Sequence, residues 1–150
     1  MKKSWRLWSS MFMLATVLAF TGCATTQSVE SGPLTTQQMV AQAKAAVPEL
    51  TVAQAKANID KGSYKVILDV REPTEFRAGH IPGAMNIPRG LLEFQVGEKI
   101  SDKSTSLLVY CKTGGRGCLA GQTLQKMGYN NVTNMDGGWI GWEKAGYPVE

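Results

Sequence analysis

The sequence predicts a single α/β domain in which helices flank both faces of an open, parallel β-sheet. Leu107–Tyr110 is an unbroken run of strand-forming residues, which is typical of a strand buried on both faces of a parallel sheet. Strand-like runs alternate along the chain with segments of helical spacing. The 150 residues suffice for one domain with a substantial core, and no internal repeat indicates a second.

The N-terminal segment 1–22 has the pattern of a secretory signal peptide. Lys2, Lys3 and Arg6 precede the apolar run 11–20, which is too short to span a membrane permanently by itself. Without this segment the net charge falls from +4 to +1, because 13 basic and 12 acidic residues remain. The basic character of the chain therefore belongs largely to targeting, and nucleic acid is not an expected partner.

Residues 20–23 resemble the cleavage box of bacterial lipoproteins. The resemblance implies that Cys23 becomes the mature N-terminus and carries lipid, palmitate included. Ala24 after this cysteine implies an outer-membrane destination facing the periplasm. An ordinary signal peptide or a short anchor is the alternative. Segment 23–34, which is rich in small polar residues, is expected to be a flexible tether.

A helix is expected over 35–47. Thr35 and Gln38 have the spacing of a capping box, and Pro48 ends the helical pattern. The sequence leaves open whether this helix packs against the main domain, 48–150, or stands apart from it.

Within 48–150 the pattern predicts alternating elements that form a sheet with right-handed crossovers. The expected helices are 51–61, 73–78, 89–98, 116–127 and 139–145, and the expected strands are 64–70, 84–87, 107–110 and 132–135.

Cys111 directly follows the predicted central strand. The carboxyl ends of parallel strands are where α/β sheets bind ligands, and the next helix directs its N-terminus at the same point. Gly114 and Gly115 allow the loop amides to turn toward the sulfur, and Arg116 adds planar donors suited to an oxyanion. The sequence therefore predicts an anion cradle around Cys111, which we expect to be largely a nucleophilic thiolate at neutral pH.

Three ordered segments, 69–88, 111–116 and 135–148, resemble the signatures of rhodanese-type sulfurtransferases, and the resemblance spans about 48–150. It implies a rhodanese-like fold and a persulfide formed on Cys111. The residues that would bind substrate are Lys112, Thr113, Gly114, Gly115, Arg116 and Gly117.

The resemblance implies transfer of sulfane sulfur from an anionic donor, such as thiosulfate, a polysulfide or a persulfide, to a thiophilic acceptor without a cofactor. Four residues separate Cys111 from Arg116, whereas related phosphatases and arsenate reductases have a longer loop. Phosphatase chemistry is therefore the weaker enzymatic alternative. A module that carries sulfur or binds a protein partner with little turnover is the non-enzymatic alternative.

Cys118 follows Cys111 by seven residues and has two interpretations. It could exchange a disulfide with Cys111 in an oxidising compartment, or it could be a small buried core residue. Spacing alone does not decide between them. These two cysteines cannot supply a four-ligand zinc site, so no metal is expected.

The single histidine, His80, lies in a predicted turn and is expected to have a hydrogen-bonded structural role. Asp69, Arg71 and Glu75 precede that turn. Because they do not match a carboxylate acid-base pair, we expect them to form a charge network that holds the turn.

Overall fold

The computed structural model describes residues 32–150. The predicted signal peptide, the predicted lipidation site Cys23 and most of the predicted tether lie outside these residues. Across the described range, no helix is both long enough and apolar enough to cross a bilayer.

Five parallel strands form one sheet in the order β1-β5-β4-β2-β3. The most buried strand, β4, occupies the centre. Because the strands are parallel, their carboxyl ends meet at one edge of the sheet. The strands are β1 (Glu49–Leu50), β2 (Val66–Asp69), β3 (Met85–Asn86), β4 (Leu107–Tyr110) and β5 (Val132–Met135).

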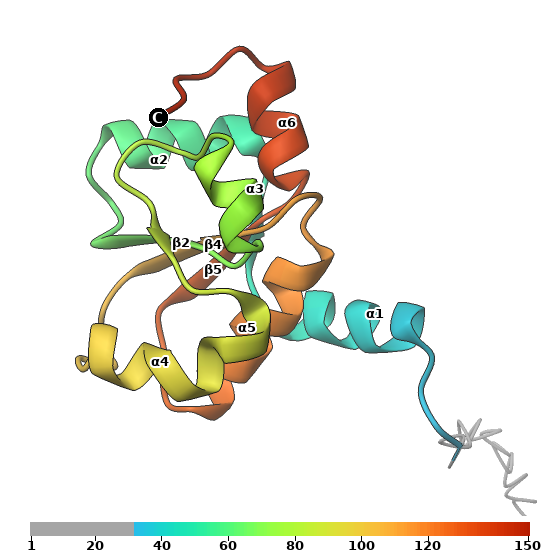
Figure 1. Ribbon diagram of the computed structural model, residues 1–150. Helices are drawn as coiled ribbons and strands as arrows, with labels where there is room; N and C mark the ends of the chain where they lie inside the picture. The colour runs from blue at the N-terminus through green and yellow to red at the C-terminus, as the bar shows by residue number, and fades with distance from the viewer. Residues whose placement is uncertain (1–31) are drawn as a thin grey trace, which may run out of the picture. The chain divides into compact units, whose positions relative to one another are not determined.

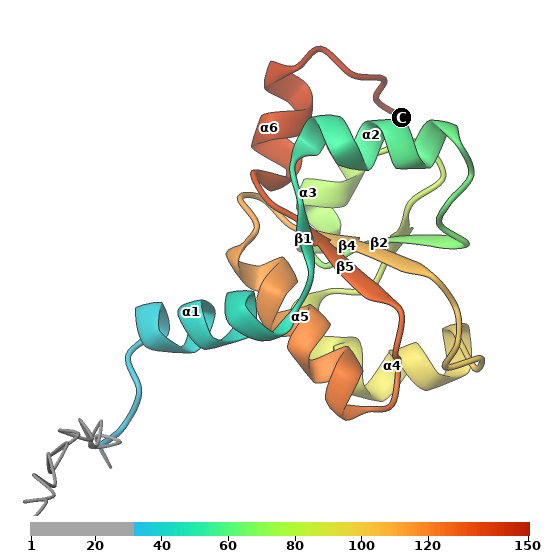
Figure 2. The same ribbon diagram turned by 180° about the vertical axis from the view of Figure 1, so that it is seen from behind.

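Helices cover both faces of this sheet, as the ribbon views from opposite sides show (Figures 1 and 2). One face carries α2, α3 and α6, and the other carries α4 and α5. The helices are α1 (Thr36–Ala46), α2 (Val52–Asp60), α3 (Pro73–Arg77), the 3-10 turn η1 (Arg89–Leu91), α4 (Leu92–Lys99), α5 (Gly115–Lys126) and α6 (Gly138–Lys144).

The alternation of side chains along β4 divides the core between the two faces. Leu107 and Val109 pack in the cluster that includes residues of α4 and α5, whereas Leu108 and Tyr110 pack in the cluster of α2 and α6. All four side chains are 0% exposed. Burial of each apolar side chain of this size contributes about 1.5–3 kcal/mol, so β4 is a rigid base for the loop that follows it.

The N-terminal helix α1 packs along α5, which answers the question that the sequence left open. The predicted capping box forms, because Thr35 and Gln38 each accept a hydrogen bond from the other's backbone. Further along, Val47 lies so close to Gly121 that a side chain there would collide with its methyl groups. The glycine in α5 therefore permits the close approach of the two segments.

The observed fold confirms the predicted α/β class with a parallel sheet between helices. The expected elements are present, with ends that differ by one to a few residues, as at α5, which begins at Gly115 rather than Arg116. One strand was not predicted. β1 contains only two residues, and a strand this short leaves no periodic pattern in the sequence.

Candidate active site

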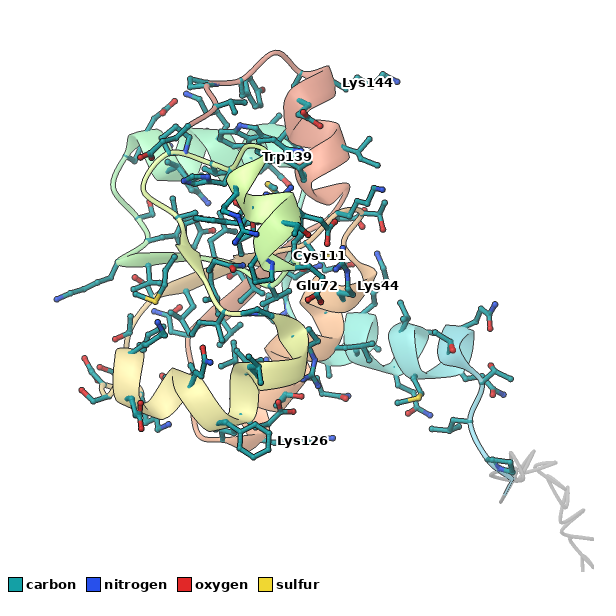
Figure 3. All side chains as sticks on the ribbon, viewed as in Figure 1. Lys44, Glu72, Cys111, Lys126, Trp139 and Lys144 are labelled. Atoms are coloured by element: carbon teal, nitrogen blue, oxygen red, sulfur yellow. The ribbon has the colours of Figure 1, made fainter. Side chains whose placement is uncertain are left out.

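Cys111 lies where β4 ends, one turn before α5 begins. The backbone N–H of Gly114 donates a hydrogen bond to the Cys111 Sγ over 3.2 Å. Gly114 adopts φ +107°, a conformation that favours glycine, and this brings its amide toward the sulfur. Figure 3 draws Cys111, Glu72 and Lys44 in one region of the view, away from Lys126 and Lys144. The predicted nucleophile therefore lies at the carboxyl edge of the sheet, beside a helix N-terminus.

The segment after β5 fixes the backbone of the cysteine loop. The N–H of Trp139 donates to the Cys111 carbonyl over 2.8 Å, and that of Ile140 donates to the Lys112 carbonyl over 3.1 Å. Gly138 makes this contact possible, because a Cβ there would collide with the Cys111 carbonyl oxygen, and its φ is +53°. The loop is thus held from the neighbouring strand as well as from its own helix.

The six loop residues predicted to bind substrate differ in accessibility. Lys112 and Thr113 are exposed, Arg116 and Gly115 are half-buried, and Gly114 and Gly117 are buried. Cys111 itself is only 1% exposed. Its sulfur is therefore almost closed off from solvent, and a donor molecule can reach it only after neighbouring side chains move.

Arg116 is engaged by a carboxylate that the sequence did not connect with it. Its Nη1 and Nη2 donate to the two Glu75 oxygens over 2.9 and 3.0 Å. The hydrogen bond from Arg116 lowers the pKa of Glu75 to about 2, and the same pair raises the pKa of Arg116. The expectation that Glu75 joins the network of Asp69 and Arg71 is corrected, because its side chain reaches the cysteine loop instead.

Asp69 and Arg71 form a buried pair without Glu75. The Arg71 side chain is 2% exposed and that of Asp69 is 0% exposed, with Nη2 and Oδ2 2.6 Å apart. Nη2 also donates to the Gly79 carbonyl over 2.7 Å, and the guanidinium lies 4.5 Å from the ring centroid of Trp139. This pair connects the turn at Gly79 with the segment that holds the cysteine loop, as a structural clamp rather than an acid-base pair.

His80 makes structural contacts. Its Nδ1–H donates to the Phe76 carbonyl over 3.1 Å, and its ring stacks on the Phe76 ring with centroids 3.7 Å apart. Two backbone hydrogen bonds join His80 to Glu150. These contacts hold the turn and the C-terminal residues together, which agrees with the structural role expected from the sequence.

Cys118 lies in a second, differently charged environment. Its thiol donates to Glu49 Oε1 over 2.9 Å and accepts from Asn134 Nδ2 over 2.9 Å. Burial and the Glu49 carboxylate raise the pKa of Cys118 to about 12. Cys118 is 0% exposed, and both cysteines of the described chain are free. Its burial fits the core interpretation, although its neighbours are polar.

The surroundings of Cys118 connect β1, β5 and α1 to the cysteine loop. Asn134 Nδ2 donates to Glu49 Oε1 over 2.7 Å and reaches the Gly114 carbonyl at 3.3 Å. From α1, Lys44 Nζ contacts Glu49 Oε2 at 3.1 Å and Asp136 Oδ1 at 2.8 Å. No local sequence pattern indicates this group, because its members lie up to 92 residues apart.

The side chain of Asn134 also explains the glycine at position 117. A Cβ on Gly117 would collide with the Asn134 amide oxygen, which makes no hydrogen bond. The first turn of α5 thus packs directly on β5. Within the described residues, no three His, Cys, Asp or Glu side chains converge in a way that could hold a metal ion.

Comparison with protein families gives one clear match. Residues 51–145 match the model of the rhodanese-like domain. The chain belongs to the rhodanese-like family. Its cysteine loop, which lies inside the matched region, is therefore the loop of a rhodanese-like domain.

Several relatives of this rhodanese-like chain are named as sulfurtransferases. The thiosulfate sulfurtransferase GlpE of Pseudoalteromonas translucida is 32% identical over 100 residues, which are 67% of this chain and 92% of the relative. A sulfurtransferase of Allochromatium vinosum is 33% identical over 84 residues, or 56% of this chain and 77% of the relative. The alignments span only 62% of a relative from Schizosaccharomyces pombe and 51% of one from Bacillus subtilis.

Solved structures extend the comparison. A Rhodopseudomonas palustris protein of unknown function, described as a possible tyrosine phosphatase, is 33% identical with a TM-score of 0.71 over 79% of this chain and 99% of its own. The thiosulfate sulfurtransferase of Pseudomonas aeruginosa is 30% identical with a TM-score of 0.66, over 77% of this chain and 22% of its own. Both share the rhodanese-like fold with this chain.

Proposed function

We propose that this protein is a sulfurtransferase that moves sulfane sulfur from a donor, through a persulfide on Cys111, to a thiophilic acceptor. The observation that carries the proposal is the amide of Gly114, which donates to the Cys111 Sγ at the start of α5. This amide and the helix N-terminus direct positive dipole ends at the sulfur that attacks the donor and then carries the persulfide. The names of the relatives support the same class of reaction.

The reaction is a double displacement. The Cys111 thiolate attacks the outer sulfur of thiosulfate, a new sulfur–sulfur bond forms, and the old one breaks as sulfite leaves with its electron pair. A thiophilic acceptor, such as cyanide or a thiol, then attacks the outer sulfur and releases the thiolate. The loop amides stabilise the negative charge of the persulfide between the two steps.

The proposed reaction requires that a donor molecule reach the buried Cys111 sulfur. Cys111 is 1% exposed, whereas the neighbouring Lys112 and Thr113 are exposed. The backbone below the sulfur is fixed by the bonds from Trp139 and Ile140. In the proposed cycle the donor therefore enters past the loop side chains, and the backbone cradle keeps its shape.

The test combines sulfur loading with turnover. The non-lipidated chain is incubated with thiosulfate, its intact mass is measured, and thiocyanate formation from cyanide is followed. We expect the mass of one added sulfur atom and steady thiocyanate production, both lost in Cys111→Ser. The proposal is wrong if the wild type gains no sulfur from thiosulfate, a polysulfide or a persulfide.

A sulfur carrier with little turnover is the second candidate. One relative from Bacillus subtilis has the words sulfur carrier protein in its name, and the deep burial of Cys111 would also slow the exchange of donors. This candidate predicts loading of Cys111 with negligible thiocyanate release. The two measurements above therefore separate it from the enzyme.

We also propose that the protein is anchored in the cell envelope through lipid on Cys23 and faces the periplasm at the outer membrane. The support is the order of basic residues, apolar run and Gly22-Cys23 in the sequence. Expression with labelled palmitate should label the wild type and leave Cys23→Ser unlabelled. Equal recovery of both forms in the soluble periplasmic fraction would contradict the anchor.

A further inference from the structure

The guanidinium of Arg116 is already occupied by a carboxylate of this chain. Glu75 bonds both of its Nη atoms, at 2.9 and 3.0 Å, in the bidentate arrangement by which arginine also binds sulfur and phosphorus oxyanions. The pKa of Glu75, lowered to about 2, keeps this carboxylate ionised at any working pH. An anionic donor must therefore compete with Glu75 for Arg116.

Arg116 lies among carboxylates rather than in a purely cationic site. Glu75 pairs with it, Glu72 precedes the same helix as its N-cap, and Lys112 is the other cation of the loop. Glu72 lies close enough to raise the pKa of Arg116 together with Glu75 and Cys111. A dianion such as thiosulfate gains little from such a site, because approach to Arg116 brings it close to the two carboxylates.

Building on the proposed sulfur transfer, we infer that Glu75 is a specificity-determining residue that favours organic persulfides of low charge over thiosulfate as donors. In this reaction the Cys111 thiolate attacks the outer, protonated sulfur of a persulfide R–S–SH. A sulfur–sulfur bond forms on Cys111, the bond in the donor breaks, and the thiolate R–S⁻ leaves with the electron pair. The donor brings at most one negative charge and does not need to bind the Arg116 guanidinium.

Glu75 can be neutralised without removing its second contact. Its Oε2 also accepts a hydrogen bond from the Glu72 N–H over 3.0 Å, in the first turn of α3. In Glu75→Gln the amide oxygen can still accept that bond, whereas the ion pair with Arg116 is lost. Glu75→Asp keeps the charge. Asp60→Asn is a matched control, since it neutralises a carboxylate paired with Lys56 at the end of α2, on the opposite edge of the sheet.

The experiment measures kcat and KM for thiosulfate and for 2-hydroxyethyl persulfide in the wild type and the three variants. For Glu75→Gln we expect the KM for thiosulfate to fall about tenfold and that for the persulfide to change less than about twofold. The KM of Glu75→Asp for thiosulfate should be closer to the wild-type value than that of Glu75→Gln. Asp60→Asn should have the wild-type kcat and KM with both donors.

Two outcomes overturn this inference and are distinguishable from each other. If the wild type loads sulfur on Cys111 but Glu75→Gln changes the KM for both donors by the same factor, or changes neither KM, the specificity role is wrong and the proposed function stands. If neither donor loads the wild type, the proposed function fails first. Thermal melting of Glu75→Gln within a few degrees of the wild type ensures that the comparison reports on the site.

Discussion

Cys111 and Cys118 are both almost fully buried, yet their sulfurs have different hydrogen-bond partners. The Cys111 Sγ accepts a hydrogen bond from the backbone N–H of Gly114. The Cys118 Sγ also accepts one, from Asn134 Nδ2, but its thiol donates in addition to the Glu49 carboxylate. The Glu49 carboxylate and burial together favour the protonated thiol at Cys118, whose pKa rises to about 12. Burial alone therefore does not distinguish the two cysteines, because the Cys118 thiol donates to a carboxylate whereas the Cys111 sulfur accepts from a backbone amide.

Replacing each cysteine in turn is the strongest test of this difference. Cys111→Ser should lower sulfur transfer on the order of a thousandfold, because the attacking sulfur is removed. Cys118→Ser should retain activity within a few-fold, since a hydroxyl can still donate to Glu49. Thiocyanate assays on both variants measure this. A large loss in Cys118→Ser, in a chain that melts like the wild type, would support a redox role for Cys118.

The next largest effect should come from the glycine that supports the Cys111 side. Gly138→Ala places a Cβ against the Cys111 carbonyl and forces an unfavourable φ, so we expect a loss of about 2 kcal/mol or more in the free energy of unfolding. Gly97→Ala in α4 is the matched control, because nothing lies within 4 Å of its added Cβ. Chemical denaturation measures both. Equal effects would show that Gly138 is not specially constrained.

A change at Glu49 should make the two cysteines more alike. Glu49→Gln removes the carboxylate that accepts from Cys118, although burial, the larger cause of its raised pKa, remains. We expect the pKa of Cys118 to fall by about one unit, which is a tenfold gain in thiolate at a given pH. Thiolate absorbance in a Cys111→Ser background follows this titration. An unchanged titration would mean that Glu49 has no influence on the thiol.

The smallest expected effect concerns acid stability on the Cys111 side. The pKa of Glu75 is about 2 in the folded chain against an ordinary value of 4.5. Its contribution to stability is therefore complete above about pH 4.5 and is lost as the pH falls toward 2. Because the pair is partly exposed, the contribution is about 1 kcal/mol or less. Unfolding curves from pH 7 to 2 should fall less steeply for Glu75→Gln than for the wild type.

Much of the Cys111 region could be predicted from the sequence because its signals are local. An apolar strand, a cysteine, two glycines and an arginine follow one another within ten residues, from 107 to 116. Each has a direct physical meaning for a strand end, a turn and a helix start. The position of Cys111, the course of its loop and the capped helix α1 follow from such short patterns.

The Cys118 region could not be predicted, because it is assembled from distant parts of the chain. Asn134 and Glu49 are brought together by the register of β1 and β5, and they lie 85 residues apart. The two-residue strand that carries Glu49 has no periodic signal of its own. The pairing of Arg116 with Glu75 has no local signal either, since the two residues lie 41 positions apart and Glu75 has nearer charged neighbours in Asp69 and Arg71.

The most direct test asks which sulfur receives the sulfane atom. Because Lys112 and Arg116 lie between the two cysteines, trypsin separates them into different peptides. After treatment with donor and alkylation, mass spectrometry should find the added sulfur on the peptide of Cys111. The peptide of Cys118 should carry the alkyl group without added sulfur. Added sulfur on the Cys118 peptide, or on neither peptide, would contradict the assignment of Cys111 as the residue that carries sulfur.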